Sequence, residues 1–460
     1  MGPTIVLAEF LSKLHYEQLP SDVITKAKEC VLDQLGVQLV ASRFEWSRIV
    51  YSTVKALGGN PECTIVNYGD KTSAPNAAFA NGTFGHGCEF DDHGPNFGHG
   101  HPGCVVIPGA VAIGEKVHAT GKDLITAIVA GYEVQGRISM CCSRSVLKRG
   151  FHNPWFIFGP VAAAAKILNL GTDGLVQAFG IAGSFAAGLR QYTKSGGETK
   201  RLHAGNAASR GILSVLLAQG GFSAPPDILE GETGFIKAFS DTYSFEPLTR
   251  GPSEELLILQ TGFKLRPSCG GIHPITDTVL RMVEANKIEP EDIKQVTVHT
   301  NTNRIDQIGR IYEPHNALGA QFSLPFSLGI ALVKRKLNLD AYMDESLWKD
   351  PEVLGFARKV VMEVDPEANM PYVQHRPDLH HKFPGKVVLT LKDGRRLEDT
   401  NRPTKGTPPG EPLSWQDVVE KFEENAATVL PSTKVQLLVE TVDKLETLGD
   451  ISELVAHLCA

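Results

Sequence analysis

Residues 105–118, VVIPGAVAIGEKVH, carry the pattern that decides the fold. Apolar residues recur in this stretch at three- and four-residue spacing, which predicts a helix, and alanine and glycine are frequent among them. The same pattern predicts helices at residues 21–39, 74–83, 123–139, 160–168, 172–188 and 207–219. Small residues let helix axes approach closely, and no dinucleotide-binding G-x-G-x-x-G follows a strand in this region. We therefore expect a tightly packed, all-helical bundle rather than a β-α-β domain.

The pattern changes after Pro267, where strands are predicted beside helices. The predicted elements are helices at residues 273–286 and 321–337 and strands at residues 293–299, 370–374 and 386–391. The sequence KDGR at residues 392–395 is a hairpin turn signal that leads into a further short strand. This part of the chain is therefore expected to be an α+β domain.

A linker rich in proline and glycine, NRPTKGTPPGEP at residues 401–412, separates this domain from a second helical region. The helices predicted there are residues 414–426, 432–445 and 451–458. We expect them to rejoin the first domain. The expected organisation is mainly α: a large all-helical domain of residues 1–260 plus 408–460, with an inserted, smaller α+β lid domain of residues 261–407.

Composition favours a globular protein that acts on a small molecule. The 460 residues include 45 basic and 52 acidic side chains, which gives a formal net charge of −7. This charge shows no excess of basic residues of the kind that binds nucleic acid or an anionic membrane surface. No signal peptide is recognised, and the most apolar windows are shorter than the roughly 20 residues of a membrane helix. Eight cysteines form no C-x-x-C pair, which suits a reducing compartment. We expect a cytoplasmic protein without nucleic-acid or membrane partners, in which Cys141 and Cys142 are buried.

Residues 81–103, NGTFGHGCEFDDHGPNFGHGHPG, gather four histidines and three acids among seven glycines. Imidazole and carboxylate exchange protons near neutral pH, and glycine lets the backbone approach a ligand closely. We interpret the stretch as an active-site loop for proton transfer, because His93 and His101 bracket a glycine-rich segment directly before a helix. A zinc or iron site is one alternative, although the spacing matches no helical H-E-x-x-H; solvated loop histidines are another.

Three further clusters combine glycine with histidine, lysine or arginine near predicted helix starts. They are RGFHNP at residues 149–154, KSGGETKRLHAGN at residues 194–206 and KLRPSCGGIH at residues 264–273. Each cluster also has a purely structural interpretation, such as a capping or core histidine in the first cluster or a solvated basic turn in the second. Taken together, the four clusters predict one pocket for a small polyanion, with histidine and lysine as acid-base groups.

The order of these clusters carries a resemblance that covers nearly the whole chain. The motifs N-G-x-x-x-H-x-x-E-F-D-D-H, H-G-H-P-G, G-F-H-N-P, T-K-R-L-H-A-G-N-A-A and K-L-R-P-S-C-G-G-I-H-P resemble, in this order, those of the MmgE/PrpD family. That family includes dehydratases, decarboxylases and epimerases that act on small polycarboxylates without a cofactor. The resemblance implies a helical domain built from both ends of the chain, an inserted α+β lid, a homodimer and no cofactor or metal.

Residues carry over from the family's decarboxylase pattern position by position. The matching positions are Asp92, His101, His152, Lys200 and Lys264. The departures are Glu89 in place of an aspartate, His93 in place of a threonine, Cys269 in place of a histidine and Phe322 in place of a tyrosine. These four changes disfavour aconitate decarboxylation, while the matching residues retain a polyanion pocket and its proton chemistry.

The resemblance implies acid-base chemistry beside a carboxylate. His101 and His152 are the expected general acid and base, oriented by Asp92, and His93 is a second acid-base candidate. The residues expected to hold substrate carboxylates or line the pocket are Lys200, Arg201, Lys264, Arg266, Glu89, Cys269 and Phe322.

The leading hypothesis is a lyase that eliminates water, or less readily carbon dioxide, from a small di- or tricarboxylic acid. An epimerase or racemase of a polycarboxylate such as iminodisuccinate would need the same site without a leaving group. A non-enzymatic helical binding protein and a metal-dependent hydrolase are the remaining alternatives.

Overall fold

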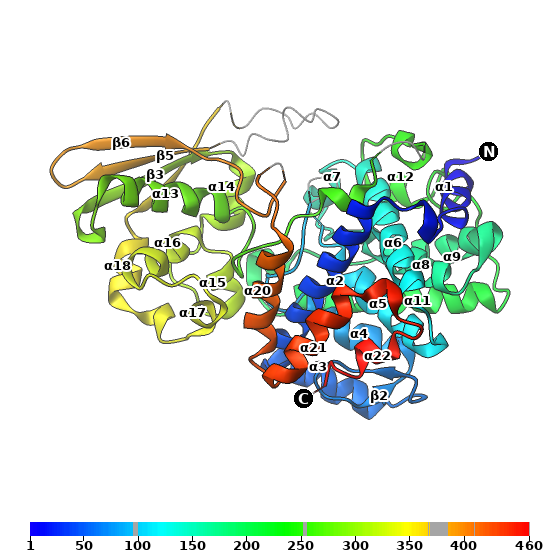
Figure 1. The fold of residues 1–460 in the computed structure, drawn as a ribbon. Helices are drawn as coiled ribbons and strands as arrows, with labels where there is room; N and C mark the ends of the chain where they lie inside the picture. Colours follow the sequence, from blue (N-terminus) through cyan, green and yellow to red (C-terminus); the bar gives the residue numbers. More distant parts are fainter. Residues whose placement is uncertain (95–99, 252–254, 367, 369–384, 409, 460) are drawn as a thin grey trace. The chain divides into compact units, whose positions relative to one another are not determined.

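The computed structural model describes residues 1–94, 100–251, 255–366, 368, 385–408 and 410–459. Its chain divides into two compact units. The first unit contains Met1–Gly87, Asp91–Phe263 and Leu413–Ala460, and the second contains Cys88–Phe90 and Lys264–Pro412. In the described part of the chain the fold is mainly α, and the sheets are small (Figure 1). This confirms the predicted fold class. Nothing in the sequence pattern indicated that Cys88–Phe90 groups with the second unit.

The first unit is built from helices with one two-stranded ladder at its edge. Its helices are α1 (Pro3–Ser12), α2 (Ser21–Ser42), α3 (Glu45–Leu57), α4 (Ala74–Gly85), α5 (Gly103–Val117), α6 (Gly121–Cys141), α7 (Ser145–Lys148), α8 (Phe158–Ile167), α9 (Gly171–Phe185), α10 (Tyr192–Ser195), α11 (Thr199–Gln219), α12 (Phe235–Phe239), α20 (Trp415–Ala426), α21 (Ser432–Asp443) and α22 (Ser452–Val455). The ladder pairs β1 (Cys63–Thr64) with β2 (Lys71–Thr72). Among the described residues, no helix combines the length and apolar character needed to cross a membrane.

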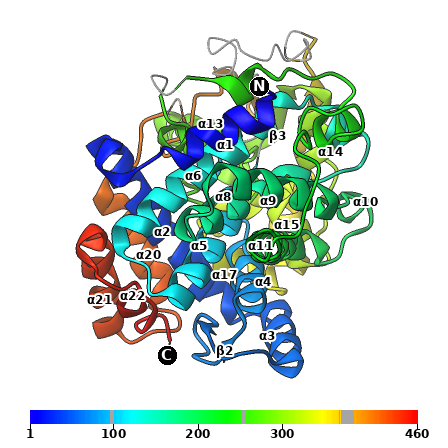
Figure 2. The same cartoon turned by 90° about the vertical axis from the view of Figure 1, so that its right-hand side faces the viewer.

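Helix α11 lies at the centre of this unit and is viewed nearly end-on in Figure 2, with α4, α5, α8 and α9 packed around it. Its closest neighbour is α4, and the contact is made by glycine. A Cβ atom on Gly82 would lie 3.1 Å from the Cα atom of Gly205 and 3.2 Å from the carbonyl oxygen of Cys104. The absence of side chains at Gly82 and Gly205 therefore lets the two helix backbones touch, as the small-residue pattern predicts.

The C-terminal helices pack on the N-terminal part of the first unit. Figure 1 shows α20 beside α2, although nearly 400 residues separate them in sequence. Phe422 fills the space beside Gly36, and the Lys421 amine donates to the Asp33 carboxylate at 2.5 Å, with both side chains buried. A buried ion pair of this kind is costly to break, because removal of one partner leaves an uncompensated charge.

The second unit holds a mixed four-stranded sheet with the order β4-β3-β5-β6. Its strands are β3 (Ile293–Thr300), β4 (Val360–Val364), β5 (Gly385–Leu391) and β6 (Arg396–Thr400). Strand β3 runs parallel to β4 and antiparallel to β5, and the predicted hairpin turn joins β5 to β6. The expected strand at residues 370–374 lies outside the described residues. Strand β4 was not predicted, since its alternation is short and its last two residues are exposed.

Helices cover this sheet and complete a second hydrophobic core. They are α13 (His273–Asn286), α14 (Thr302–Ile308), α15 (Ala317–Gln321), α16 (Leu324–Val333), α17 (Leu339–Met343) and α18 (Pro351–Ala357). Val279 of α13 and Leu328 of α16 are buried in one cluster with Val298 of β3 and Val387 of β5. The apolar side of each element therefore faces a shared interior, as the predicted α+β domain requires.

Two predicted helices need correction. The helix expected at residues 321–337 is shorter and runs from Leu324 to Val333. It begins there because Ser323 is extended, its hydroxyl accepts from the Phe326 amide, and Pro325 follows in the first turn. Helix α11 was expected from residue 207 but begins at Thr199. Its first turns are polar, so the apolar period does not reveal them, although Lys200 and Arg201 are buried there.

The contact between α4 and α11 generates a testable prediction. Replacing Gly205 with alanine would place a methyl group against the Phe79 carbonyl oxygen and the Thr83 hydroxyl. Overpacking of this kind costs roughly 1–3 kcal/mol, so we expect Gly205→Ala to lower the urea midpoint of unfolding.

The matched control lies at the end of the same helix. Gly220 has right-handed backbone angles, and an added Cβ would meet its nearest neighbour at an ordinary 3.4 Å. Gly220→Ala should leave the free energy of unfolding within about 0.5 kcal/mol of the parent or raise it, so the urea midpoint should not fall. Equal effects of the two variants would contradict the close-contact explanation.

Candidate active site

The loop after α4 places one carboxylate between two histidines. His86 follows the last residue of α4, and its Nδ1 lies 2.6 Å from Oδ2 of Asp91, with both side chains fully buried. The Nδ1 atom of His101 lies 3.4 Å from the same oxygen. Since a carboxylate favours the protonated form of a neighbouring imidazole, Asp91 supplies negative charge to both rings.

The next carboxylate, Asp92, has a different environment. Its Oδ1 accepts from the Gly103 amide at the start of α5 at 2.9 Å, and its Oδ2 lies 2.6 Å from the hydroxyl of Tyr132 on α6. Burial raises the pKa of Asp92 to about 8, with the nearby Asp33 and Asp91 carboxylates acting in the same direction, against the hydrogen bonds from Tyr132 and Gly103. Asp92 therefore ties α5 to α6 as a neutral acid near pH 7.

Asp92 also contacts His101 through its main chain. The carbonyl oxygen of Asp92 lies 2.7 Å from His101 Nδ1. A carbonyl can only accept, so the Nδ1 atom carries a hydrogen and Nε2 is the nitrogen that gains or loses a proton. The carboxylate of the neighbouring Asp91, a residue without a predicted role, also lies beside this ring.

A second pair of histidines joins the segment before η3 (Pro154–Ile157) to α11. Nδ1 of His152 lies 2.9 Å from Nδ1 of His203. Burial lowers the pKa of His152 well below its usual value, and the charge of Lys200 adds to this effect. Burial also lowers the pKa of His203 to about 4, assisted by His86 and Lys200. Both imidazoles are therefore neutral near pH 7.

The first turn of α11 supplies two buried cations with different surroundings. Lys200 is 3 % exposed, and its charge acts on both His152 and His203. Arg201 donates from Nε to the Gly87 carbonyl at 2.7 Å, lies 4.1 Å from the centre of the Trp46 ring and pairs with Glu198. Through these contacts Arg201 holds the chain at Gly87, just after the end of α4. Lys200 is thus the cation of this turn that acts on the histidine pair.

The two histidine pairs belong to one cluster within the first unit. The ring of His86 lies 5.0 Å from that of His101 and 6.1 Å from that of His152, between ring centres. The cluster brings together the predicted residues His101, His152 and Lys200. It adds His86 and His203, which stood in the quoted motifs without an assigned role. His93 is placed by main-chain hydrogen bonds with Gly262, and no assignment of its side chain follows from them.

Predicted site residues of the second unit include a buried ion pair. The Lys264 amine donates to the main-chain oxygen of Glu89 at 3.0 Å and lies 3.5 Å from its carboxylate. Glu89 has a positive φ of 54°, which is uncommon for a residue with a side chain. Gln321 holds the same segment by donating to the Cys88 and Pro267 carbonyls at 2.6 and 2.9 Å. The glutamate at position 89 is therefore fixed locally, with its charge matched by Lys264.

The other predicted residues of the second unit lie near the start of α13 and the end of α15. Burial raises the pKa of the Cys269 thiol, against the lowering effect of the Arg304 charge, so it remains a thiol at neutral pH. Arg266 pairs with Asp277 at 2.5 Å. Phe322 follows α15 and packs against the second core. The guanidinium of Arg304, a residue without a predicted role, lies against Gly271.

One group of described residues has the composition of a metal site. His86, Asp91 and Cys104 are buried and offer ligand atoms within 4.8 Å of one another. Burial and the nearby Asp91 and Asp92 carboxylates raise the pKa of the Cys104 thiol, whose Sγ lies 3.1 Å from the His101 carbonyl oxygen. In the structure the three side chains form a hydrogen-bonded group, since His86 Nδ1 lies 2.6 Å from Asp91 Oδ2 and 3.6 Å from Cys104 Sγ.

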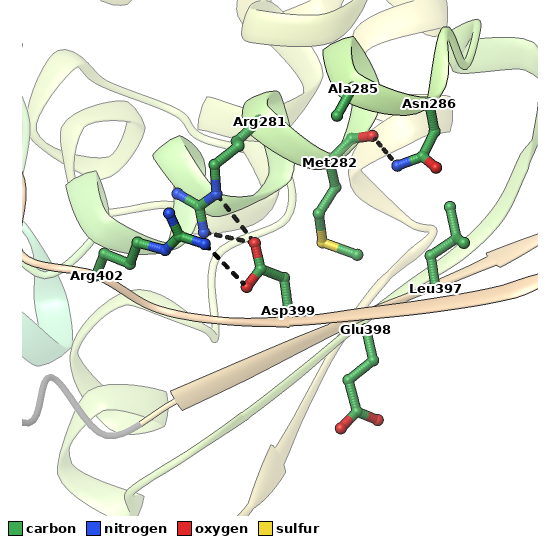
Figure 3. Close-up of a pocket in the computed structure, with 8 residues that line it drawn as sticks. All are labelled: Arg281, Met282, Ala285, Asn286, Leu397, Glu398, Asp399 and Arg402. Carbon is green, nitrogen blue, oxygen red and sulfur yellow. Dashed lines mark hydrogen bonds and ion pairs between the residues drawn. The ribbon is translucent and has the colours of Figure 1, made fainter.

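A surface groove of the second unit contains none of the predicted residues. Figure 3 shows it between α13 and β6, with Arg281 and Arg402 turned toward the carboxylate of Asp399. Arg281 donates to Asp399 at 2.9 and 2.7 Å. The groove combines these paired charges with Glu398, which pairs with Lys386, and with apolar side chains such as Met282, and no histidine is among the residues that line it. The acid-base cluster of the first unit is therefore the better candidate site.

The neutral state of Asp92 predicts a pH dependence of stability. Between about pH 4 and pH 8, the unfolded chain has released this proton while the folded chain still binds it, so the free energy of unfolding falls as pH rises. Asparagine keeps a carbonyl for Gly103 and an amide donor for Tyr132 without titrating. We expect Asp92→Asn to gain stability relative to the parent across this window, by up to about 1.4 kcal/mol per pH unit, in urea unfolding at pH 5 and pH 7.5.

A second variant separates charge from packing. Asp92→Ala removes both contacts and should destabilise the protein at either pH. If the parent and Asp92→Asn show parallel pH dependences, Asp92 is ionised in the folded protein and the assignment is wrong.

Comparison with known proteins identifies the family. The MmgE/PrpD N-terminal domain model matches residues 6–248, and the C-terminal domain model matches residues 267–447. A cis-aconitate decarboxylase of Aspergillus terreus is 28% identical over 484 residues, covering 99% of this chain and 96% of the relative. Human cis-aconitate decarboxylase is 29% identical, with 96% and 91% covered, and 2-methylcitrate dehydratase of Escherichia coli is 23% identical, with 93% and 91% covered. With both domain models matched in order along the chain, the protein belongs to the MmgE/PrpD family.

Proposed function

We propose that this protein is a lyase that eliminates water from a small di- or tricarboxylic acid by acid-base catalysis without a cofactor. The observation that carries the proposal is the pair of opposed histidine environments in one cluster, with a carboxylate beside His101 and a cation beside His152. Titratable groups whose surroundings favour opposite protonation states are suited to act as acid and base in one reaction. The similarity to a decarboxylase and a dehydratase named for tricarboxylic acids supports this class of substrate.

His101 is assigned as the general acid. Its Nδ1 hydrogen is held by the Asp92 carbonyl, and the Asp91 carboxylate at 3.4 Å favours the imidazolium form. The remaining Nε2–H is the proton that a leaving hydroxyl group would take as it departs as water.

His152 is assigned as the general base. Its pKa is lowered by burial and by Lys200, so the ring is neutral and has a lone pair at neutral pH. It would remove the proton from a carbon adjacent to a substrate carboxylate, and expulsion of the hydroxyl group would then complete the double bond. His152 ends protonated and His101 ends neutral, so exchange with solvent restores both groups.

Lys200 is assigned to the developing negative charge. Removing a proton beside a carboxylate moves charge onto the carboxylate oxygens as an enolate-like species forms. A buried ammonium group at the start of α11 stabilises that charge more than it stabilises the ground state. The same cation keeps the base unprotonated at rest, so the two effects reinforce each other.

The requirement for both an acid and a base distinguishes elimination of water from decarboxylation. Loss of carbon dioxide generates the carbanion without a base, and only a later proton donor is needed. An epimerase also uses two acid-base groups, on opposite sides of one carbon, and is the second candidate for that reason. The formation of an alkene separates the two.

The decisive experiment is proton NMR in deuterated buffer with citrate, 2-methylcitrate, cis-aconitate, malate, tartrate and the iminodisuccinate stereoisomers. A lyase that eliminates water gives a new vinyl signal from a hydroxy acid, which His152→Asn should reduce by about 10²- to 10⁴-fold. Deuterium exchange with a new diastereomer and no vinyl signal would replace the proposal with an epimerase. Carbon dioxide release from cis-aconitate would replace it with a decarboxylase.

The assignment of His152 also predicts the acid limb of the pH–rate profile. A base must be neutral, so activity is lost as pH falls through its pKa, which lies below the usual 6.5. Replacing Lys200 with methionine removes a cation that lowers this pKa, so the acid limb should move to higher pH. Lys200→Arg keeps the charge and should leave the limb in place, while kcat falls in both variants; an unmoved limb in Lys200→Met would contradict the coupling.

A further inference from the structure

We infer that His203 is a positioning residue that holds His152 in the tautomer whose Nδ1 carries the hydrogen, so that Nε2 is free to act as the base. The inference rests on the proposed function and deepens it, because the sequence motifs assigned no role to His203. Its starting observation is the 2.9 Å distance between the two Nδ1 atoms.

Two nitrogens at this distance share one hydrogen. A neutral imidazole has one N–H and one lone pair, so one ring must donate and the other must accept. Both rings are neutral because burial lowers both pKa values. The tautomers of His152 and His203 are therefore opposite: if His152 carries its hydrogen on Nδ1, His203 carries its hydrogen on Nε2.

The direction of this bond follows from the chemistry of the base. His152 has no other hydrogen-bond partner for its ring among the described residues, so Nε2 is the nitrogen left for a substrate. It can accept a proton only if its hydrogen is on Nδ1, which makes His203 the acceptor. When His152 becomes an imidazolium, the lone pair of His203 continues to accept the Nδ1 hydrogen and stabilises the charge.

Local packing fixes the two rings against each other. The His152 amide donates to the Gly188 carbonyl at 3.0 Å, and a Cβ atom on Gly188 would lie 2.8 Å from the His152 carbonyl oxygen and 3.5 Å from His203 Nδ1. The ring of Tyr192 meets both imidazoles edge-on, at 5.5 and 6.0 Å between ring centres. The pair is therefore enclosed by a glycine on one side and an aromatic ring on another.

The charged and titratable groups that face the pair explain why a histidine occupies this position. They are Lys200 of α11 and the imidazoles of His86 and His101, and the pKa of His152 is shifted downward by all of them. A carboxylate in place of His203 would draw a proton onto His152 at rest and remove the base. A neutral acceptor orients the ring while leaving it unprotonated.

The experiment compares His203→Asn with His203→Leu in the full-length protein labelled with ¹³C and ¹⁵N histidine. The asparagine carbonyl can accept the His152 hydrogen, whereas leucine fills a similar volume without an acceptor. In the parent and in His203→Asn, we expect the His152 Nδ1 signal of a protonated nitrogen and the Nε2 signal of an unprotonated one. In His203→Leu, the hydrogen should redistribute toward Nε2. The signals are assigned by their loss in His152→Asn.

Kinetics provide the second readout. With the substrate found by the NMR screen, His203→Leu should lower kcat by about tenfold or more with a small effect on KM, and His203→Asn should recover most of the loss. The acid limb of the pH profile should shift only in the leucine variant.

The tautomer measurement needs no substrate, so failure of the proposed function and failure of this inference are distinguishable. An unchanged His152 tautomer in His203→Leu would overturn the inference, as would an asparagine variant as impaired as the leucine variant. If the screen finds no substrate but the tautomer shifts as expected, the proposed function fails and the positioning role stands.

Discussion

The candidate site depends on the direct contact between the backbones of α4 and α11 at Gly82 and Gly205. Four residues beyond Gly82 the chain reaches His86, and Lys200 and His203 lie within the two turns before Gly205. Any side chain at the crossing would separate the helices and draw Lys200 and His203 of α11 away from His86, which follows α4. Because the influence of a charge falls with distance, even in a low-dielectric interior, the protonation states of the cluster follow from this packing.

Consecutive carboxylates in the same loop serve different purposes because neighbouring side chains leave the backbone in different directions. Asp91 turns toward His86 and His101, where an ionised group has hydrogen-bond donors to accept from. Asp92 turns toward α5 and α6, where Gly103 and Tyr132 are satisfied by a neutral acid. Two like charges buried side by side repel each other, so the neighbouring Asp91 carboxylate adds to the rise in the pKa of Asp92.

Helices were predicted correctly where apolar residues repeat at helical spacing. They were missed in part where polar residues of the candidate site interrupt that repeat. Helix α13 was predicted with the limits that the structure has, His273–Asn286, since its buried face repeats regularly. The start of α11 was hidden because buried Lys200 and Arg201 resemble a solvated turn. The motifs contained every histidine of the cluster, but the pairing of His152 with His203 joins residues 51 positions apart, and no local spacing encodes such a contact. The contacts within the cluster therefore required the structure, while the residue types and the family did not.

The arrangement of charge within the cluster gives the proposed reaction its direction. Negative charge is concentrated at Asp91, beside His86 and His101, and positive charge at Lys200, beside His152 and His203. The ring of His86 lies between the two halves. Exchanging the charges would place a cation beside His101 and a carboxylate beside His152, which would disfavour the proposed acid role of the first ring and the proposed base role of the second. With the charges as they are, each neighbour favours the protonation state that the proposed step of its ring requires.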